Sequence, residues 1–121
     1  MQFLTDLYQF NRTLDFHPGV ASGLGWSPPT DVYETEEAFV VTLELAGVDH
    51  KALQISFLHD TLTLSGERSD PVKPASARYA QLEINYGPFR KEIRFALPIR
   101  RQAISAQCRE GLLKVVLPKA R

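Results

Sequence analysis

The sequence AQCREGLLKVVLPKAR, residues 106–121, decides the fold because it has the pattern of a β-hairpin that closes a domain. Apolar and polar residues alternate on both sides of its turn, which is the period of two that strands show. The two apolar rows are Ile104, Ala106 and Cys108, and Leu113, Val115 and Leu117. We place the turn at residues 109–111, where Gly111 can take a positive φ at little cost. Pro118 has no backbone N–H for a ladder, so it should end the second strand.

Similar alternating rows recur upstream of this hairpin and are separated by Gly, Pro or turn residues. We expect further strands near residues 29–34, 39–45, 53–57, 61–65, 82–86 and 89–97. The first should lie at a sheet edge, His59 and Asp60 should form a turn, and Gly66 should end the strand at 61–65. Strands at such short intervals predict an all-β fold, an antiparallel immunoglobulin-like β-sandwich of seven or eight strands over residues 30–118. No βαβ unit and no helix longer than two turns is expected there.

Residues 1–29 have a different pattern and are interpreted as an N-terminal arm and linker, partly helical or disordered. The apolar residues of 1–16 lie near helical spacing, which predicts a short amphipathic helix, whereas 17–29 are rich in Gly and Pro. The aromatic residues, Trp26 included, either pack on the domain or make the arm adhesive toward other apolar surfaces. The residues expected to make arm contacts are Phe3, Leu7, Tyr8, Phe10, Leu14 and Phe16.

Composition narrows the possible partners and the compartment. Residues 1–60 carry nine acidic and two basic residues, and residues 61–121 carry five acidic and twelve basic ones. This asymmetry indicates either two oppositely charged surfaces or charge complementarity between subunits. The sequence lacks the basic face with interleaved aromatic residues that would indicate nucleic-acid binding. It also shows neither an apolar run long enough to span a membrane nor the pattern of a signal peptide. A single cysteine, Cys108, excludes an internal disulfide and favours a cytoplasmic location.

Neither a catalytic centre nor a cofactor site is predicted. The three histidines, His17, His50 and His59, have no second ligand at metal-binding spacing. His50 and His59, each beside an aspartate, would have to combine with Cys108 to form a nucleophilic site, and no local motif supports that combination. We therefore interpret the histidines as linker and turn residues, Cys108 as a small strand residue, and the protein as no enzyme and without a cofactor.

Residues 30–119, taken as one domain, resemble the α-crystallin domain of the small heat-shock proteins. The motifs that carry the resemblance are DVYE at residues 31–34, ELAGV at 44–48, LTLSGER at 62–68, YGPF at 86–89, LP at 97–98, and the Ala106 to Leu113 segment with its Gly111 turn. Ala46 stands where the family usually has proline. The segment from YGPF to LP is about two residues longer than in the family, so Lys91 is the best match to the arginine usual there.

The resemblance implies an ATP-independent chaperone, or holdase, which binds unfolding client proteins and prevents their aggregation. It also implies a homodimer made by strand exchange, in which the strand at 82–86 adds to the partner's first strand. The residues implied at that interface are Asp31, Val32, Tyr33, Leu82, Ile84, Tyr86 and Lys91. Residues 120–121 carry no Ile-x-Ile tail of the kind that builds large oligomers in the family, so the expectation stops at a dimer, with a larger oligomer left open.

In the family that tail docks in a groove between the fourth and eighth strands, which is also the implied client-binding site. The residues placed there by the resemblance are Leu53, Ile55, Phe57, Ile104, Ala106 and Cys108. A client segment or a neighbour's arm, through Leu14 and Phe16, could fill the groove, or loops could cover it. The alternative to a chaperone is a p23/CS-like co-chaperone or scaffold domain that docks one specific protein. Such domains lack the strand expected at 82–86, so this segment discriminates between the two.

Overall fold

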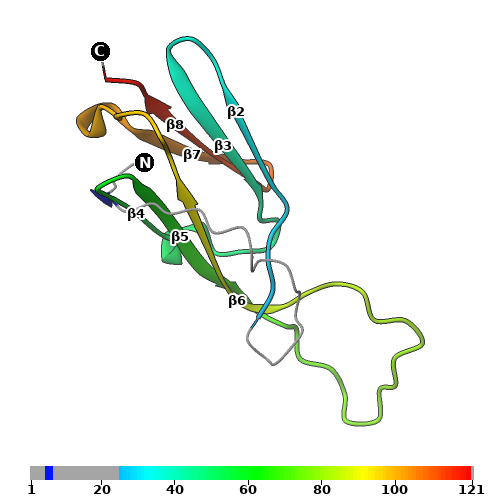
Figure 1. The fold of residues 1–121 in the computed structure, drawn as a ribbon. Helices are drawn as coiled ribbons and strands as arrows, with labels where there is room; N and C mark the ends of the chain where they lie inside the picture. Colours follow the sequence, from blue (N-terminus) through cyan, green and yellow to red (C-terminus); the bar gives the residue numbers. More distant parts are fainter. Residues whose placement is uncertain (1–4, 7–24, 121) are drawn as a thin grey trace.

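The computed structural model describes residues 5–6 and 25–120, with the backbone alone described at 5–6. Two four-stranded sheets face each other, in the strand orders β1-β4-β5-β6 and β2-β3-β8-β7 (Figure 1). Seven of these strands fall within residues 30–118. In that range the helical segments are two short 3₁₀ turns, His50–Ala52 and Arg101–Ala103. The predicted antiparallel β-sandwich is therefore confirmed.

The second of these sheets is built from β2 (Thr30–Glu34), β3 (Ala38–Glu44), β8 (Leu112–Pro118) and β7 (Ser105–Arg109). All three of its pairings are antiparallel, and β2 lies at the edge as expected. The closing hairpin turns at Glu110 and Gly111, whose φ angles are 52° and 81°. Two successive positive φ angles match the right-handed twist of the flanking strands, which is why a turn of this kind closes the hairpin.

The other sheet contains β4 (Gln54–Leu58), β5 (Thr61–Arg68) and β6 (Gly87–Arg94), paired antiparallel. His59, with φ 60°, makes the tight turn between β4 and β5. β1 (Thr5–Asp6) adds to the free edge of β4 as a parallel strand, with Thr5 opposite Ser56. The inward-facing rows of both sheets meet in one apolar core.

Side chains in that core follow the predicted alternation. Phe39, Val41 and Leu43 of β3 lie opposite Leu117, Val115 and Leu113 of β8. The fully enclosed side chains, with no exposed surface, are Val41, Leu43, Leu62, Leu64, Leu113, Val115 and Leu117. Period two thus identified the core because each row buries its alternate residues against the facing sheet.

The prediction that Gly66 ends its strand is wrong, because β5 continues to Arg68. Gly66 lies opposite Phe89 in the ladder. A Cβ at Gly66 would approach two ring atoms of Phe89 and a methyl group of Leu53, each at 3.0 Å. The glycine therefore leaves room for the Phe89 ring to cover the strand rather than stopping the strand.

The strand expected at residues 82–86 is not formed in the single chain. This segment belongs to a long connection, residues 69–86, that leaves the sandwich and returns to it between β5 and β6 (Figure 1). A strand exists only where its backbone pairs with another strand, and the extended connection lies away from both sheets. We call residues 69–86 the projecting loop.

The N-terminal expectations are answered only at described positions. Thr5 and Asp6 form a strand, so the helix expected over 1–16 is wrong at these two residues, because the edge of β4 supplies a pairing partner. The six residues named for arm contacts, Phe3, Leu7, Tyr8, Phe10, Leu14 and Phe16, lie outside the described residues. Trp26 is 7% exposed and belongs to the core cluster, so for this aromatic residue the packing interpretation is correct.

Candidate functional site: the two open sides of the sandwich

Each side of the sandwich, where the edges of the two sheets come together, carries a hollow. The loop side lies between β2 and β6, and its hollow of about 280 Å³ is lined mainly by apolar residues. The lining comes from Val32, Glu34 and Phe39 in one sheet, and from Ile93, Arg94, Phe95, Ala96 and Leu97 in and after β6. Val32 and Leu97 are each 44% exposed. An apolar hollow beside a sheet edge can accept side chains of an added strand.

β2 is the outer strand on the loop side, and among residues 25–120 it pairs only with β3. The other edge of β2 is therefore a template for another extended segment. The predicted interface residues Asp31, Val32 and Tyr33 are all exposed on β2. Glu34 is held by Lys119, whose Nζ donates a hydrogen bond to Glu34 Oε2 at 2.7 Å. The edge is thus acidic at Asp31, while the charge at its far end is paired.

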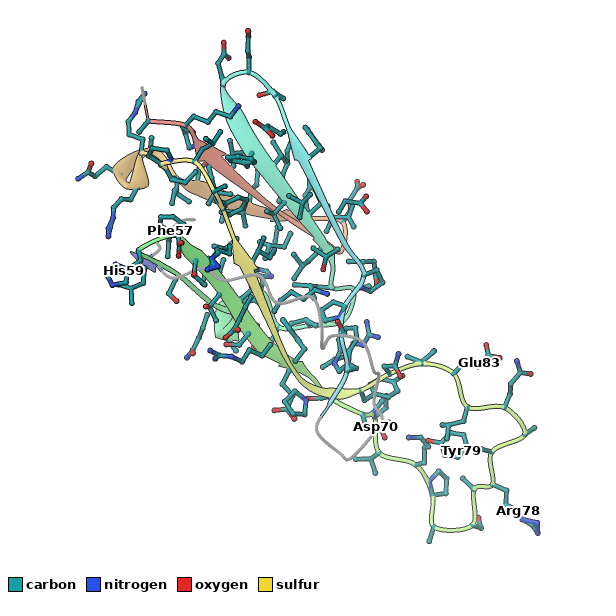
Figure 2. The ribbon with its side chains drawn as sticks, viewed as in Figure 1. Phe57, His59, Asp70, Arg78, Tyr79 and Glu83 are labelled. Carbon is teal, nitrogen blue, oxygen red and sulfur yellow. The ribbon has the colours of Figure 1, made fainter. Side chains whose placement is uncertain are left out.

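The projecting loop presents apolar side chains to solvent. Leu82 is 66% exposed and Ile84 is 63% exposed, with Glu83 between them. Figure 2 shows Arg78, Tyr79 and Glu83 on this loop, far from Phe57 and His59 on the sandwich. Two apolar residues at i and i+2 face the same side of an extended segment. They therefore have the spacing required to enter a hollow beside a sheet edge.

A local cluster organises the first half of the loop. Lys73 Nζ donates hydrogen bonds to Asp70 Oδ1 at 2.7 Å and to the Pro71 carbonyl at 2.9 Å. The same ammonium group lies 5.3 Å from the centroid of the Tyr79 ring. The hydrogen bond to Asp70, followed by that to Tyr79, raises the pKa of Lys73 above its usual value. The ammonium is therefore charged at neutral pH, and it holds residues 70–79 of the loop together.

Two of the predicted interface residues contact their own chain. Lys91 Nζ donates a hydrogen bond to Ser27 Oγ at 2.9 Å, so this basic residue in the inward row of β6 faces the linker. Tyr86 is half-buried, and its ring centroid lies 5.7 Å from the Arg68 guanidinium carbon. Asp31, Val32, Tyr33, Leu82 and Ile84 remain exposed in the single chain.

The groove side lies between β4 and β7. Of the six residues predicted there, Ile55, Phe57, Ile104 and Ala106 are buried in the core. Leu53 and Cys108 are half-buried and line a hollow of about 200 Å³ together with Leu45, Gly47, Val48, His50, Arg109, Glu110 and Gly111. The hollow therefore adjoins only one end of the predicted strip, because the inward parity of the other four residues turns them into the core.

Cys108 does not have the environment of a nucleophile. Burial raises the pKa of the Cys108 thiol above its ordinary value, so the thiol stays protonated at neutral pH. His50 lines the same hollow. Within residues 25–120, no group of three side chains of metal-binding type comes together. In the same part of the chain, no helix is long and apolar enough to cross a membrane.

Sequence reasoning missed Arg68 as a functional candidate. Its guanidinium group contacts the linker through Trp26, the β3–β4 corner through Ala46 and the end of the projecting loop through Asn85. Alternation of apolar residues carries no information on such contacts between distant segments. The only sequence signal is that Arg68 ends the LTLSGER segment immediately before the loop.

Comparison with known proteins gives a consistent result. The model of the Hsp20/alpha crystallin family matches residues 31–121. Small heat shock protein C2 of Rickettsia felis is 27% identical over 110 residues, which are 91% of this chain and 71% of that protein. Heat shock protein 42 of Saccharomyces cerevisiae is 33% identical over 107 residues, 84% of this chain but only 28% of that protein. The structure of heat shock protein 16.0 from Schizosaccharomyces pombe matches with a TM-score of 0.72 at 31% identity, over 78% of this chain and 88% of that one.

Proposed function

The chain belongs to the Hsp20/alpha crystallin family, and from this premise we propose that it is an ATP-independent holdase that binds unfolding proteins and prevents their aggregation. The observation that carries the proposal is the loop side, where an unpaired strand edge lies beside an apolar hollow. Unfolding proteins expose extended apolar segments, and such a segment can pair its backbone with β2 and place side chains in the hollow. The family match favours this function over the p23/CS-like alternative.

A heated client protein tests the holdase proposal. We expect its light scattering to fall when this protein is added in stoichiometric amount without nucleotide. Val32→Asp should weaken this protection because it places a charge at the hollow, whereas Val72→Asp is the control, since Val72 is 97% exposed on the projecting loop. No suppression by the unaltered protein at a several-fold excess would contradict the proposal.

We also propose that the chain forms a homodimer by exchange of the projecting loop. The proposal is supported by Leu82 and Ile84, which are exposed at alternate positions, and by the open edge of β2. In the dimer, residues 82–86 add to the partner's β2 and the two apolar side chains enter the loop-side hollow. The loop thereby becomes the strand that the sequence predicts and that the single chain does not form. The loop and a client segment then compete for the same edge, so clients bind there when the loop is released.

Deletion of residues 70–86 should then give monomers in light scattering. A finer test replaces Leu82 and Ile84 together by serine. Burying an aliphatic side chain contributes about 1.5–3 kcal/mol, so the double substitution should raise the dimer dissociation constant by about 100-fold or more. Val72→Ser is the matched control. A deletion variant that stays dimeric would exclude loop exchange.

The groove-side hollow is proposed as a second binding site for apolar segments. Leu53 and Cys108 line it, and β1 pairs with the neighbouring edge of β4. Cys108→Phe should fill the hollow and reduce client protection, with Ser105→Phe on the exposed face of β7 as the control. Equal protection by both variants would remove the hollow from the mechanism. We further propose a cytoplasmic location, which the free Cys108 supports.

A further inference from the structure

Arg68 lies at the neck of the projecting loop. It is the last residue of β5 and lies opposite Gly87, the first residue of β6. Arg68 Nε donates a hydrogen bond to the Asn85 carbonyl at 2.9 Å, and Nη1 donates another to the Ala46 carbonyl at 2.9 Å. One guanidinium group thus joins the returning end of the loop to the corner that follows β3.

Two aromatic rings complete this neck. The guanidinium carbon of Arg68 lies 4.1 Å from the centroid of the Trp26 ring and 5.7 Å from that of Tyr86. Both distances are within the range at which a cation is attracted to an aromatic ring. Arginine is suited to this position because its planar, permanently charged fork can donate in two directions while it lies against a ring.

Trp26 is itself fixed to the start of β6. Its indole Nε1 donates a hydrogen bond to the Gly87 carbonyl at 2.8 Å, and its backbone N–H donates to the Pro88 carbonyl at 3.1 Å. The Phe89 ring packs edge-on against it, with centroids 5.6 Å apart. Trp26 therefore gives the Arg68 guanidinium a rigid support, and through Arg68 it restrains Asn85.

We propose that Arg68 is a positioning residue that sets the direction in which residues 82–86 extend from the sandwich, and so presents Leu82 and Ile84 to the β2 edge of a second copy of this chain. This inference rests on the proposed loop exchange. The hydrogen bond to Asn85 restrains the residue directly after Ile84, so the part of the loop that must pair is partly ordered before association. Ordering a segment in advance reduces the entropy lost on binding.

The test compares Arg68→Gln with Arg90→Gln. Arg90 is an exposed arginine of β6 whose side chain donates to Glu92, so its replacement removes the same charge without touching the neck. We expect Arg68→Gln to raise the dimer dissociation constant about tenfold over the control in sedimentation velocity. Arg68→Lys should lie between the two, because lysine keeps the charge but not the fork. Equal dissociation constants for the two glutamine variants would overturn the proposal.

Trp26 is the only tryptophan, so its fluorescence reports on the neck alone. In Arg68→Gln at concentrations that give monomers, acrylamide should quench Trp26 more readily than in Arg90→Gln. The thermal midpoints of the two monomers should agree closely. If the midpoint of Arg68→Gln falls instead and accounts for the weaker dimer, the role is merely structural and the proposal is overturned.

Failure of loop exchange is distinguishable from failure of this inference. If the variant lacking residues 70–86 remains dimeric, loop exchange is wrong and the presentation of Leu82 and Ile84 to β2 falls with it. If that variant is monomeric but Arg68→Gln dimerises as tightly as Arg90→Gln, loop exchange stands and the positioning role of Arg68 is wrong.

Discussion

Leu64 in β5 is fully buried, whereas Leu82, in the loop that follows the same strand, exposes 66% of its surface. Leu64 lies between β4 and β6, opposite Ile55 on one side and Lys91 on the other. Leu82 pairs with no strand in the part of its own chain that the structure describes. The same residue type therefore stabilises the sandwich in one region and remains available to a partner in the other. The contrast separates a region that buries its leucines within the chain from a loop that exposes them.

The largest expected effect tests this contrast directly. Leu64→Ala should lower the free energy of unfolding by about 2–5 kcal/mol, because it removes buried methyl groups and leaves a cavity. Leu82→Ala should change it by about 0.5 kcal/mol or less, as an exposed substitution does. Urea unfolding at concentrations that give monomers measures both. Comparable losses from the two substitutions would show that the loop packs on the sandwich.

Gly25 tests the contact between the linker and Pro88, at the start of β6 where the projecting loop rejoins the sandwich. An added Cβ there would lie 1.8 Å from the Pro88 carbonyl oxygen, and the φ of Gly25 is +107°. Gly25→Ala should therefore release Trp26 and cost about 1–3 kcal/mol, seen as a red shift of the tryptophan emission.

Gly47→Ala is the matched control for this substitution. Its φ is also positive, at +82°, but an added Cβ would make only ordinary contact with Arg68 at 3.4 Å. It should be destabilising without the red shift. An unchanged emission in Gly25→Ala would mean that Trp26 stays docked and that the linker does not depend on this close approach.

A smaller effect compares one ion pair in each region. Lys119 and Glu34 join β2 to the segment after β8, and their side chains are 16% and 51% exposed. Glu34→Gln should cost about 0.2–1 kcal/mol, decreasing with added salt. Asp70→Asn, which breaks the pair with Lys73 in the loop, should leave the unfolding midpoint unchanged. The opposite ranking would place the loop inside the cooperative unit.

The smallest effect concerns Cys108 and its pH dependence. Burial raises the pKa of the Cys108 thiol in the folded protein, so the folded state favours the protonated thiol. The resulting contribution of Cys108 to the free energy of unfolding is fully present below the pKa of the unfolded thiol, about 8.5, and is lost as pH rises through the folded pKa. Cys108→Ala should remove this decline in chemical unfolding. Iodoacetamide should also alkylate Cys108 more slowly than a cysteine placed at the exposed position 72 in the Cys108→Ala background. Equal alkylation rates would show that the thiol is not protected.

Much of the sandwich could be predicted because its signals are local. Alternation along each strand identified the buried rows, Gly111 was found as a residue that takes positive φ at little cost, and a turn was predicted at His59 where the structure has one. The edge position of β2 was also predicted correctly. The family resemblance was found from motifs spread over residues 31–113 and is confirmed by the match over residues 31–121.

The sequence by itself determined which residues share a face, because side-chain direction in a strand depends only on parity. Tertiary structure decided what covers each face. It placed Ile55, Phe57, Ile104 and Ala106 in the core and left Leu53 and Cys108 at the hollow.

Contacts between distant segments also depended on the tertiary structure. It kept Gly66 inside β5 beneath the Phe89 ring, and it brought Trp26, Ala46 and Asn85 to Arg68. It left residues 82–86 without a paired strand among the described residues. Parity is a property of neighbouring residues, whereas cover, close approach and strand pairing depend on segments that only the folded chain brings together.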